Sequence, residues 1–417
     1  MNIELAARTS RVEPSATVAI SNLASELEAD GVDVVDLSVG EPDFPTPENV
    51  VEAGKAAIDA GHTGYTPSTG IPELKQAIVE KLAADGLEHT TDEVIVTPGG
   101  KQALYEVFQT VVDEGDEVVL LDPAWVSYEA MAKLAGGDLT RVDTATYDFA
   151  LEPALDDLAE AVSDETQLLV VNSPNNPTGA VYSDAALEGV RDLAADHDTL
   201  VISDEIYKEI TYGVESTSLG SLEGMGDRTV TLNGFSKAYS MTGWRLGYFA
   251  GPADLVSEAG KLHSHSVTCA TNFVQHAGVE ALENTEDAVL EMRDSFAERR
   301  EMLLDLFADH GLDVPAPEGA FYMMLPVDGD DSEARSASER SSSAERSSAD
   351  RSSGRSPRED GDEPRDQAWC EAVIEEAHVA TVPGSAFGTP GYARISYAAA
   401  EDRLREAVSR LADHEFI

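Results

Sequence analysis

Positive charge is scarce in this sequence. Of its 417 residues only 28 are lysine or arginine, against 79 aspartate and glutamate residues, and the net charge is −51. The acidic residues are spread along the chain rather than gathered in a tail. Because phosphates are bound by clustered basic faces, this composition excludes nucleic acid and an anionic membrane surface as partners. We interpret the charge as a solvated, halophilic surface that works in concentrated salt, where screening removes the self-repulsion.

Cysteine and long apolar runs are scarce too. The only cysteines, Cys269 and Cys370, cannot build a disulfide framework or a CxxC motif, which fits a reducing cytoplasm. No run of eighteen apolar residues could span a membrane, and the opening MNIELAARTSRVEPS has no apolar core of the signal-peptide type. The nine histidines show no metal-ligand spacing. We therefore expect a cytoplasmic protein with no membrane partner and no metal.

What the chain does contain is an alternation of short apolar runs with helical patterns. The runs predicted as buried parallel strands are EVIVTPGG (93–100), EVVLLDPAW (117–125), QLLVVNSPNNPTG (167–179), TLVISDEIY (199–207), RTVTLNGFSK (228–237) and WRLGYFAG (244–251). Helical patterns lie between them, at 101–113, 128–134 and 184–196. This alternation predicts an α/β sheet covered by helices on both faces.

Polar residues end several of these runs. They are Asn172, Asp204, Ser236 and Lys237. Because the carboxyl ends of parallel strands meet at one edge of a sheet, where ligands gather, we expect these four residues to share a site.

The last third of the chain has a different organisation. A long helical stretch at about 275–309 is predicted to link the sheet to a smaller domain, which resumes at GAFYMMLPV (319–327) and ends in a helix from about Ala400. Between Asp330 and Asp366 there is no Leu, Ile, Val, Met, Phe, Tyr or Trp. Such a segment cannot bury enough apolar surface to offset its ordering entropy, so we predict a disordered insertion over 329–366.

Lys237 is one of only eight lysines in the chain. Most lysines are solvated surface groups. Lys237, however, lies between two apolar strands and eight residues before Arg245. Burial beside a second cation lowers the pKa of an amine and makes it a nucleophile, as Schiff-base chemistry requires. Asp204 closes a strand of the same sheet, where it could cap a helix, pair with a cation or hold a proton on a heteroaromatic nitrogen.

Two turns carry further signals. TPGGKQAL (97–104) places a Gly-Gly turn at a helix N-terminus, which is a natural phosphate cradle. A Walker loop is rejected because Gln102 stands where Ser or Thr would follow Gly-Lys. In SPNNPTG (173–179) the asparagines could serve a site or simply make a turn.

Seven motifs, taken in order, resemble the class I aminotransferases of the pyridoxal-phosphate fold type I family. They are VGEPDF (39–44), TPGGKQAL, PAWVSY (123–128), NSPNNPTG (172–179), SDEIY (203–207), the Lys237 stretch with MTGWRLGY (241–248), and YARISYA (392–398). The resemblance is strongest to prokaryotic aspartate aminotransferases, some of which also use prephenate. It implies a large domain with a mostly parallel seven-stranded sheet sandwiched by helices, and a smaller α/β domain.

The resemblance also implies domain boundaries. An N-terminal segment (1–45) would belong to the small domain, followed by a large cofactor-binding domain (46–299) and a small C-terminal domain (300–417) that carries the insertion.

Pyridoxal 5′-phosphate is the cofactor that the resemblance implies, and each contact carries over to one residue. Lys237 matches the Schiff-base lysine and general base, Asp204 the partner of the pyridine nitrogen, and Tyr207 the partner of the ring hydroxyl. The remaining cofactor contacts would come from Trp125 on the ring, Asn176 on the ring oxygen, Gly100, Lys101 and Arg245 at the phosphate, Ser236 near it, and Tyr65 from a neighbouring subunit.

Substrate contacts carry over in the same way. Arg394 matches the arginine that clamps the α-carboxylate bidentately, assisted by Asn176 and the Gly40 backbone, with Trp125 beside the substrate. In the aspartate group a lysine at the position of Lys101 binds the distal carboxylate. Its helpers would be the hydroxyls of Ser15 and Thr17. Tyr65 implies a homodimer with shared active sites.

Two positions depart from the family pattern. Gly234 stands where many relatives have Ser, so one hydroxyl contact to phosphate is missing unless Ser236 replaces it. Ala124 stands where close relatives often have an aromatic residue.

The activity implied is transamination between L-aspartate and 2-oxoglutarate, giving oxaloacetate and L-glutamate. Prephenate, aromatic amino acids and alanine are alternative substrates on the same scaffold. A lyase of this fold would form a keto acid without an amino acceptor. A non-catalytic regulator of this fold would need a fused DNA-binding domain, which the short acidic start of the chain does not suggest.

Overall fold

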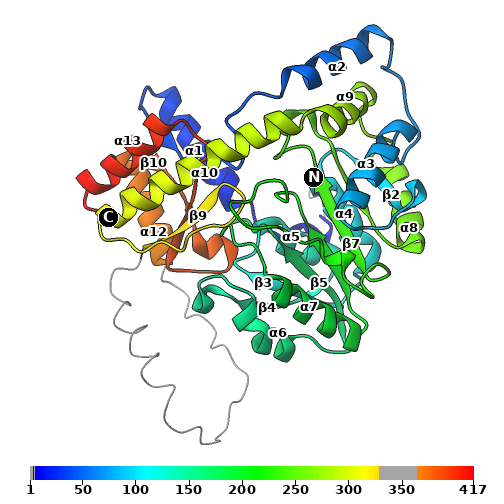
Figure 1. The fold of residues 1–417 in the computed structure, drawn as a ribbon. Helices are drawn as coiled ribbons and strands as arrows, with labels where there is room; N and C mark the ends of the chain where they lie inside the picture. The colour runs from blue at the N-terminus through cyan, green and yellow to red at the C-terminus, as the bar shows by residue number, and fades with distance from the viewer. Residues whose placement is uncertain (1–2, 4, 328–363) are drawn as a thin grey trace, which may run out of the picture.

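The computed structural model describes residue 3, residues 5–327 and residues 364–417. Two lobes are joined by a long helix (Figure 1). The larger lobe is built on a seven-stranded sheet of order β2-β8-β7-β6-β5-β3-β4. Its strands are β2 (Val94–Thr97), β3 (Glu117–Asp122), β4 (Asp138–Asp143), β5 (Thr166–Asn172), β6 (Leu200–Asp204), β7 (Thr229–Gly234) and β8 (Gly247–Ala250). The predicted α/β class is confirmed.

Helices cover both faces of this sheet, because successive strand residues point to opposite sides. In β5, Leu168 and Val170 pack under one set of helices, whereas Leu169 and Val171 pack under the other. The first set is α4 (Gly100–Val111), α5 (Val126–Ala135) and α8 (Ala253–Ser266). The second set comprises α6 (Leu155–Ala161) and α7 (Asp184–Asp196), and, over β2 and β8, α3 (Pro72–Ala84) and α9 (Asn272–Asn284). Helix α2 (Glu48–Asp59) packs along α9.

Strand β8 departs from the parallel arrangement predicted for residues 244–251. It pairs antiparallel with both β7 and β2. The connection 235–246 contains no α-helix that could return the chain to the other end of the sheet. A parallel pair needs such a crossover, so β8 runs back beside β7.

Strand β4 was not predicted. Its sequence DLTRVD has charged or polar residues at four of six positions, and only Val142 is buried. It pairs with β3 at the edge of the sheet, where one side of a strand faces water. An edge strand of this kind lacks the continuous apolar run by which buried strands are recognised.

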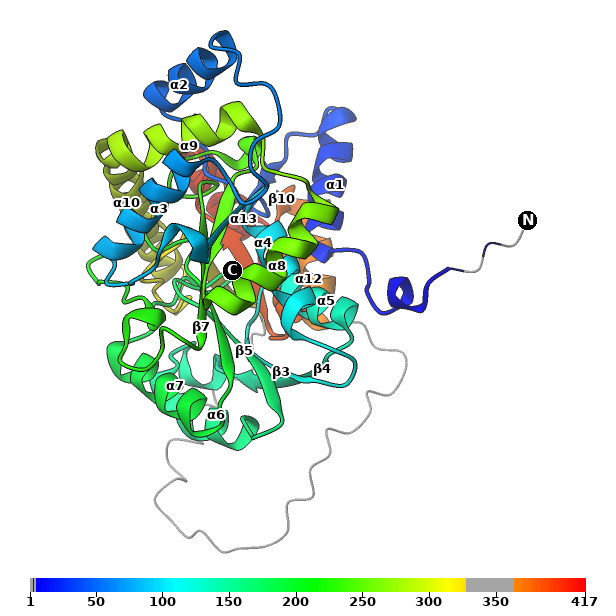
Figure 2. The ribbon, with the colours of Figure 1, turned by 90° about the vertical axis from the view of Figure 1, so that its right-hand side faces the viewer.

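The smaller lobe combines both ends of the chain. Strand β1 (Val35–Asp36) pairs with β10 (Val379–Ala380), and β12 (Tyr392–Ser396) lies between β11 (Val382–Pro383) and β9 (Tyr322–Pro326). Helix α1 (Ala16–Ala29) buries Ala24 against Ile374 and Ala380. Helix α13 (Glu401–Asp413) covers the lobe with Leu404 and Leu411. Residues before α1 run past α5 of the larger lobe (Figure 2), where Arg11 pairs with Glu114 at 3.1 Å.

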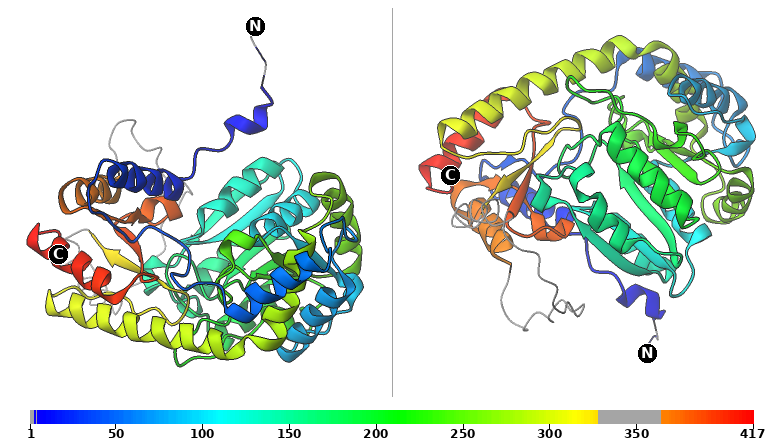
Figure 3. Two further views of the ribbon diagram at one scale, coloured as in Figure 1. Left: turned by 90° about the horizontal axis from the view of Figure 1, so that it is seen from above. Right: turned by 60° about the horizontal axis from the view of Figure 1, so that its bottom comes forward.

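The helical link predicted at 275–309 is interrupted once. Helix α9 ends at Asn284, Thr285 has an extended φ of −124°, and α10 (Glu286–Asp309) follows. Glu286 and Asp287 open α10, where carboxylates interact favourably with the helix N-terminus. Helix α10 then crosses between the lobes (Figure 3), with Val289 in the core of one lobe and Phe307 in that of the other. The predicted boundary at 299/300 falls inside this continuous helix.

The end of the predicted insertion needs correction. Residues 328–363 lie outside the described residues, but α12 (Arg365–Ala372) begins within the predicted range 329–366. Asp366 is buried and accepts a hydrogen bond from the Ser385 amide at 2.6 Å. Its polarity suggested disorder, yet its carboxylate satisfies a backbone donor that would otherwise lack a partner. In the described part of the chain no helix is long and apolar enough to cross a membrane.

Candidate active site

A cavity of about 520 Å³ opens between the two lobes at the carboxyl ends of β5, β6 and β7. The predicted site residues that line it are Thr17, Gly40, Gly100, Lys101, Trp125, Asn176, Asp204, Tyr207, Ser236, Lys237, Arg245 and Arg394. Asn172 lines it as well. The four polar strand ends predicted to share an edge therefore do so.

Asn172 organises the edge of the sheet. It lies opposite Asp204 in the β5–β6 register, and its side-chain amide donates to the Asp204 carbonyl at 2.9 Å. Its side-chain oxygen accepts a hydrogen bond from the backbone amide of Asn176, also at 2.9 Å. One buried asparagine thus fixes both the strand that carries Asp204 and the turn that carries Asn176.

Lys237 follows β7 and reaches into the cavity, where its amine donates to the Gly40 carbonyl. Burial lowers the pKa of Lys237 to about 8, and the nearby charge of Arg394 acts in the same direction. Glu41, at the rim, opposes this shift. A substantial fraction of the amine is therefore neutral near pH 8, which is the state in which it is a nucleophile.

Asp204 is buried at the end of β6. Burial raises its pKa to about 6, against the hydrogen bond that it accepts from the Tyr128 hydroxyl at 2.6 Å. The Ile206 amide donates to the other carboxylate oxygen at 3.2 Å. Tyr128 was missed in the sequence, although it lies only three residues after Trp125, the N-cap of α5, and the centres of the two rings are 5.5 Å apart.

Tyr207 points from the turn after β6 into the cavity. Its hydroxyl lies 2.9 Å from the Tyr322 hydroxyl, and burial raises its pKa. Tyr322, on β9 of the smaller lobe, also lines the cavity and was missed by the sequence analysis. Only the single tyrosine of the apolar run GAFYMMLPV could have signalled it, and a tyrosine in a strand is ordinarily a packing residue.

Arg394 enters the cavity from β12. It is buried and donates to the Asn176 side-chain oxygen at 3.2 Å and to the Ser38 carbonyl at 2.5 Å. Its guanidinium lies 4.6 Å from the centre of the Tyr322 ring. Its Nε has no hydrogen-bond partner among the described residues. A buried, incompletely paired guanidinium fits a carboxylate ligand, since unpaired buried donors are costly.

An anion cradle lies at the start of α4. Gly99, with φ +86°, leads into the helix, and a Cβ placed on it would lie 2.6 Å from Nη2 of Arg245. Arg245 has a positive φ of 56° and donates to the Thr242 carbonyl at 2.8 Å. A helix N-terminus beside an arginine is suited to a phosphate group. Ser236 lines the same cavity.

Lys101, the second residue of α4, lies 4.8 Å from the centre of the Trp125 ring. Burial lowers the pKa of Lys101, and the charge of Arg245 contributes. The lysine therefore lines the cavity, although its side chain remains open to solvent.

Two predicted site residues lie outside the cavity lining. Ser15 precedes α1, and its hydroxyl lies 2.7 Å from the Thr17 hydroxyl, so it adjoins a lining residue. Tyr65 is 88 % exposed and does not line this chain's own cavity.

The chain matches the family model described as "Aminotransferase class I and II" over residues 32–411. The protein belongs to this family. It is 40% identical over 412 residues to the aspartate/prephenate aminotransferase of Thermus thermophilus, with 98% of each chain covered. It is 39% identical over 420 residues to the aspartate aminotransferase of Geobacillus stearothermophilus, covering 100% of this chain and 99% of that one. Among solved structures, the aspartate aminotransferase from Thermus thermophilus with maleate superimposes with a TM-score of 0.86 at 39% identity, covering 99% of this chain and 100% of that one.

The protein is thus an enzyme, an aminotransferase, and aminotransferases of this family use pyridoxal phosphate. Its cavity fits that cofactor: a half-buried lysine of lowered pKa, a buried carboxylate, and an arginine beside a helix N-terminus converge on it. No cluster of three or more His, Cys, Asp or Glu side chains suited to a metal occurs among the described residues.

Gly234, where the resemblance implied a departure from the family pattern, lies in a crowded part of the structure. A Cβ added there would lie 3.1 Å from the Gly247 Cα and 3.1 Å from Ile206 Cδ1. Ala124 is buried, and its amide donates to the Phe387 carbonyl at 2.9 Å, which ties the large lobe to the small one.

Proposed function

We propose that this aminotransferase transfers the amino group of L-aspartate to 2-oxoglutarate, forming oxaloacetate and L-glutamate. The observation that carries the proposal is the presence of two separate cations for a dicarboxylate. Arg394 lies buried in the small lobe, and Lys101 lies in the wall formed by α4. Relatives about 40% identical along the whole chain carry the name aspartate aminotransferase, and one solved relative is described with maleate, a dicarboxylate.

Pyridoxal phosphate, when bound, supplies a ring that withdraws electrons from the substrate Cα. Lys237 would hold the cofactor through its amine in the resting enzyme. Once the substrate amine has displaced it, the same amine would move the proton at Cα as a general base. Its lowered pKa of about 8 suits this task, because a base is most effective when its pKa lies near the working pH.

The residues around Lys237 would orient the ring. Asp204, held by Tyr128, would keep the pyridine nitrogen protonated, and Tyr207 with Asn176 would bind the ring oxygen. Trp125 would stack on the ring. Arg245, Ser236 and the amides of Gly100 and Lys101 would hold the phosphate, where the helix dipole assists.

The substrate would be held at both ends. Arg394 would bind the α-carboxylate bidentately, with Asn176 and the Gly40 backbone beside it. Lys101 would bind the distal carboxylate together with Thr17. Ser15, outside the lining, would act through its contact with the Thr17 hydroxyl.

We also propose a homodimer with active sites at the subunit interface. Tyr65 is 88 % exposed, and Ile58, seven residues earlier, is 46 % exposed on α2. A large aromatic and a large aliphatic side chain exposed on one segment support a protein contact there. In such a dimer Tyr65 would reach the phosphate of the partner's cofactor.

The proposal includes a halophilic, cytoplasmic enzyme. The net charge of −51 supports function in concentrated salt, and the two free thiols, Cys269 and Cys370, support a reducing compartment.

Prephenate is the second candidate acceptor, because several relatives at similar identity are named aspartate/prephenate aminotransferases. Prephenate also carries a second carboxylate, so the same two cations would bind it. Alanine and aromatic amino acids, which lack that group, are weaker candidates.

Substrate selection is tested by steady-state kinetics in concentrated salt. With 2-oxoglutarate as acceptor, aspartate should exceed alanine and phenylalanine in kcat/KM by about 100-fold, the contribution of a charge-assisted pair between Lys101 and the distal carboxylate. Glutamate with prephenate measures the second candidate. A preference for alanine or phenylalanine over aspartate would overturn the proposed substrate.

A further inference from the structure

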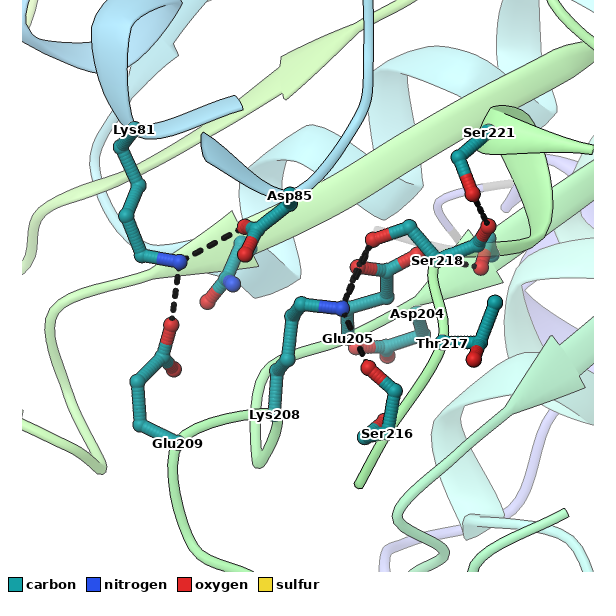
Figure 4. A network of polar contacts seen from close by, with 12 residues as sticks. Lys81, Asp85, Asp204, Glu205, Lys208, Glu209, Ser216, Thr217, Ser218 and Ser221 are labelled. Atoms are coloured by element: carbon teal, nitrogen blue, oxygen red, sulfur yellow. Dashed lines mark hydrogen bonds and ion pairs between the residues drawn. The ribbon is translucent and has the colours of Figure 1, made fainter. Parts of the chain in front are cut away.

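The end of β6 and the turn that follows it carry two residues of the site on one side and a polar network on the other. Asp204 and Tyr207 line the cavity. Glu205, Lys208 and Glu209 point away from it into contacts with α3 and with the segment 216–221 (Figure 4). The five-residue turn is therefore anchored from behind.

Glu205 and Lys208 form the inner part of this network. The side chain of Glu205 is 4 % exposed and that of Lys208 is 9 % exposed, and their charged atoms lie 3.6 Å apart. The Ser218 hydroxyl donates to Glu205 at 2.7 Å and accepts from Lys208 at 2.8 Å. Lys208 also donates to the Ser216 carbonyl at 2.7 Å, and the Ser203 hydroxyl donates to Glu205 at 2.9 Å.

Lys81 and Glu209 form the outer part. Lys81, on α3, lies 2.8 Å from Glu209 and 2.6 Å from Asp85, and all three side chains are largely shielded from solvent. Opposite charges so close raise the pKa of Lys81 well above its usual value. Helix α3 is thereby fixed to the end of the turn.

Backbone hydrogen bonds transmit this anchoring to the site. The Lys208 amide donates to the Glu205 carbonyl at 2.9 Å, and the Ile210 amide donates to the Tyr207 carbonyl at 2.8 Å. The Glu205 amide donates to the Leu232 carbonyl of β7 at 2.8 Å. Loss of the Lys208 side-chain contacts would therefore remove one of the restraints on the backbone between Asp204 and Tyr207.

The use of lysine in this network is itself informative. The chain has only eight lysines and a net charge of −51, yet two of the eight lie in this network. Surface ion pairs lose most of their value in concentrated salt, whereas buried pairs are screened much less. Lys81 and Lys208 therefore form their ion pairs where added salt weakens them least.

We propose that Lys208 and Lys81 are positioning residues for the proposed transamination, which hold the turn 205–209 so that Asp204 and Tyr207 keep their places against the cofactor ring. Lys208 has a second task, because it balances the charge of Glu205 immediately beside Asp204. The inference rests on the proposed roles of Asp204 and Tyr207.

Charge at Glu205 is felt at Asp204, whose pKa it raises. The other groups that face Asp204 are Tyr128 from α5, which donates to it, and Lys237, whose charge lowers its pKa. Around the network itself lie Asp85, which raises the pKa of Glu205, and the buried hydroxyls of Tyr239 and Tyr248.

The test compares Lys208→Met with the double variant Lys208→Met/Glu205→Gln, with Lys208→Arg and with Lys261→Met. Lys261 is an exposed lysine on α8 that pairs with Glu258, so its variant is the matched control. Lys208→Met should lower kcat about tenfold with little change in KM for aspartate, the pattern of a misplaced catalytic group. The double variant should recover most of the loss because no unpaired charge remains. Lys208→Arg should recover part of it, and Lys261→Met should equal the wild type.

The second readout does not depend on turnover. The visible absorption band of the bound cofactor is titrated with pH in each holoenzyme. In Lys208→Met its midpoint should shift by about half a pH unit or more, and the double variant should return it to the wild-type value. If Lys208→Met fails to fold, Ser218→Ala, which removes the hydroxyl shared by Glu205 and Lys208, takes its place with the same expectation.

Several results would overturn the inference. A folded Lys208→Met enzyme with wild-type kcat and an unshifted absorption titration would overturn it. A lower melting temperature with kcat and the titration midpoint unchanged would also overturn it, because Lys208 would then serve stability alone. A loss that the double variant does not relieve would contradict charge balance by Lys208. If the wild type binds cofactor but ignores aspartate, the proposed substrate is wrong, whereas the absorption titration still decides this inference.

Discussion

The cavity and the outer surface of this aminotransferase carry opposite excess charge. The lining of the cavity includes four cations, Lys101, Lys237, Arg245 and Arg394, and two carboxylates, Glu41 and Asp204. The chain as a whole has 79 acidic against 28 basic residues. The charged groups of the outer surface and those of the cavity therefore lie in different environments.

Surface carboxylates stand in water, where salt screens them at distances beyond a few ångströms. Of the cavity cations Arg394 is buried and Lys237 half-buried, whereas Lys101 and Arg245 remain open to solvent. Partial burial lowers the pKa values of Lys237 and Lys101. Salt should therefore govern whether the chain folds, while the cavity governs what the folded enzyme does. The predictions below test this separation, beginning with the largest expected effect.

Lys237→Ala should abolish turnover, by roughly 10⁴-fold or more, because the variant loses both the cofactor linkage and the proton transfer at Cα. The fold should persist, since Lys237 contributes no apolar packing to the core clusters. Turnover and circular dichroism in concentrated salt check both points. Lys261→Ala, at an exposed site, is the control. Near-normal turnover in Lys237→Ala would show that the chemistry lies elsewhere.

Lys101→Ser should lower kcat/KM for aspartate by about 10- to 100-fold while changing the value for alanine much less. The reason is that only aspartate has a distal carboxylate for this lysine to bind. Parallel kinetics with both donors provide the measurement. Equal losses for the two amino acids would mean that Lys101 serves the cofactor and not the substrate.

Tyr128→Phe should shift the acid limb of the kcat/KM profile to higher pH. The Tyr128 hydroxyl stabilises ionised Asp204, so its removal raises the pKa of Asp204 above its value of about 6. Asp204 then takes up a proton at higher pH, and activity falls earlier as the pH is lowered. A charged hydrogen bond corresponds to about one pH unit. Activity near pH 8 should change by less than about threefold. An unshifted acid limb of the kcat/KM profile would show that Tyr128 does not influence the ionisation of Asp204.

Lowering the salt concentration should destabilise the whole fold but leave the chemistry of the folded fraction nearly unchanged. Repulsion among surface carboxylates grows as screening is removed, so the denaturation temperature should fall steeply below molar salt. The kcat of protein that remains folded should vary by less than about threefold. Calorimetry and active-site titration at each salt concentration measure the two quantities. A kcat that falls in proportion to salt, with the fold intact, would break the separation between surface and cavity.

How much of the fold can be predicted from the sequence depends on whether a strand is buried or lies at the edge of the sheet. The buried strands β5, β6 and β7 can be recognised in the sequence by their apolar runs. The polar residues at their ends, from Asn172 to Lys237, line one cavity as predicted, because the carboxyl ends of parallel strands lie at the same edge of the sheet. Edge strand β4 was not recognised because water on one side of it allows charged or polar residues at four of its six positions.

Site residues that belong to a sequence motif were predicted, whereas residues brought to the site by packing between distant parts of the chain were not. Tyr322 reaches the cavity only because β9 of the small lobe lies against the large one, and Asp366 is buried only because the Ser385 amide needs an acceptor. Neither contact is local in sequence. The anchoring of Lys81 to Glu209 is another example, because 128 residues separate the partners in the sequence (209 − 81 = 128).

The central claim is that Lys237 binds pyridoxal phosphate in a cavity that selects a dicarboxylate. It is tested most directly by the visible absorption spectrum of the purified protein in concentrated salt, before and after addition of L-aspartate. We expect a yellow protein that bleaches on aspartate, is restored by 2-oxoglutarate, and is unaffected by the same concentration of alanine. A yellow protein indifferent to aspartate would contradict the dicarboxylate claim, and a colourless protein that pyridoxal phosphate cannot reconstitute would contradict the role of Lys237.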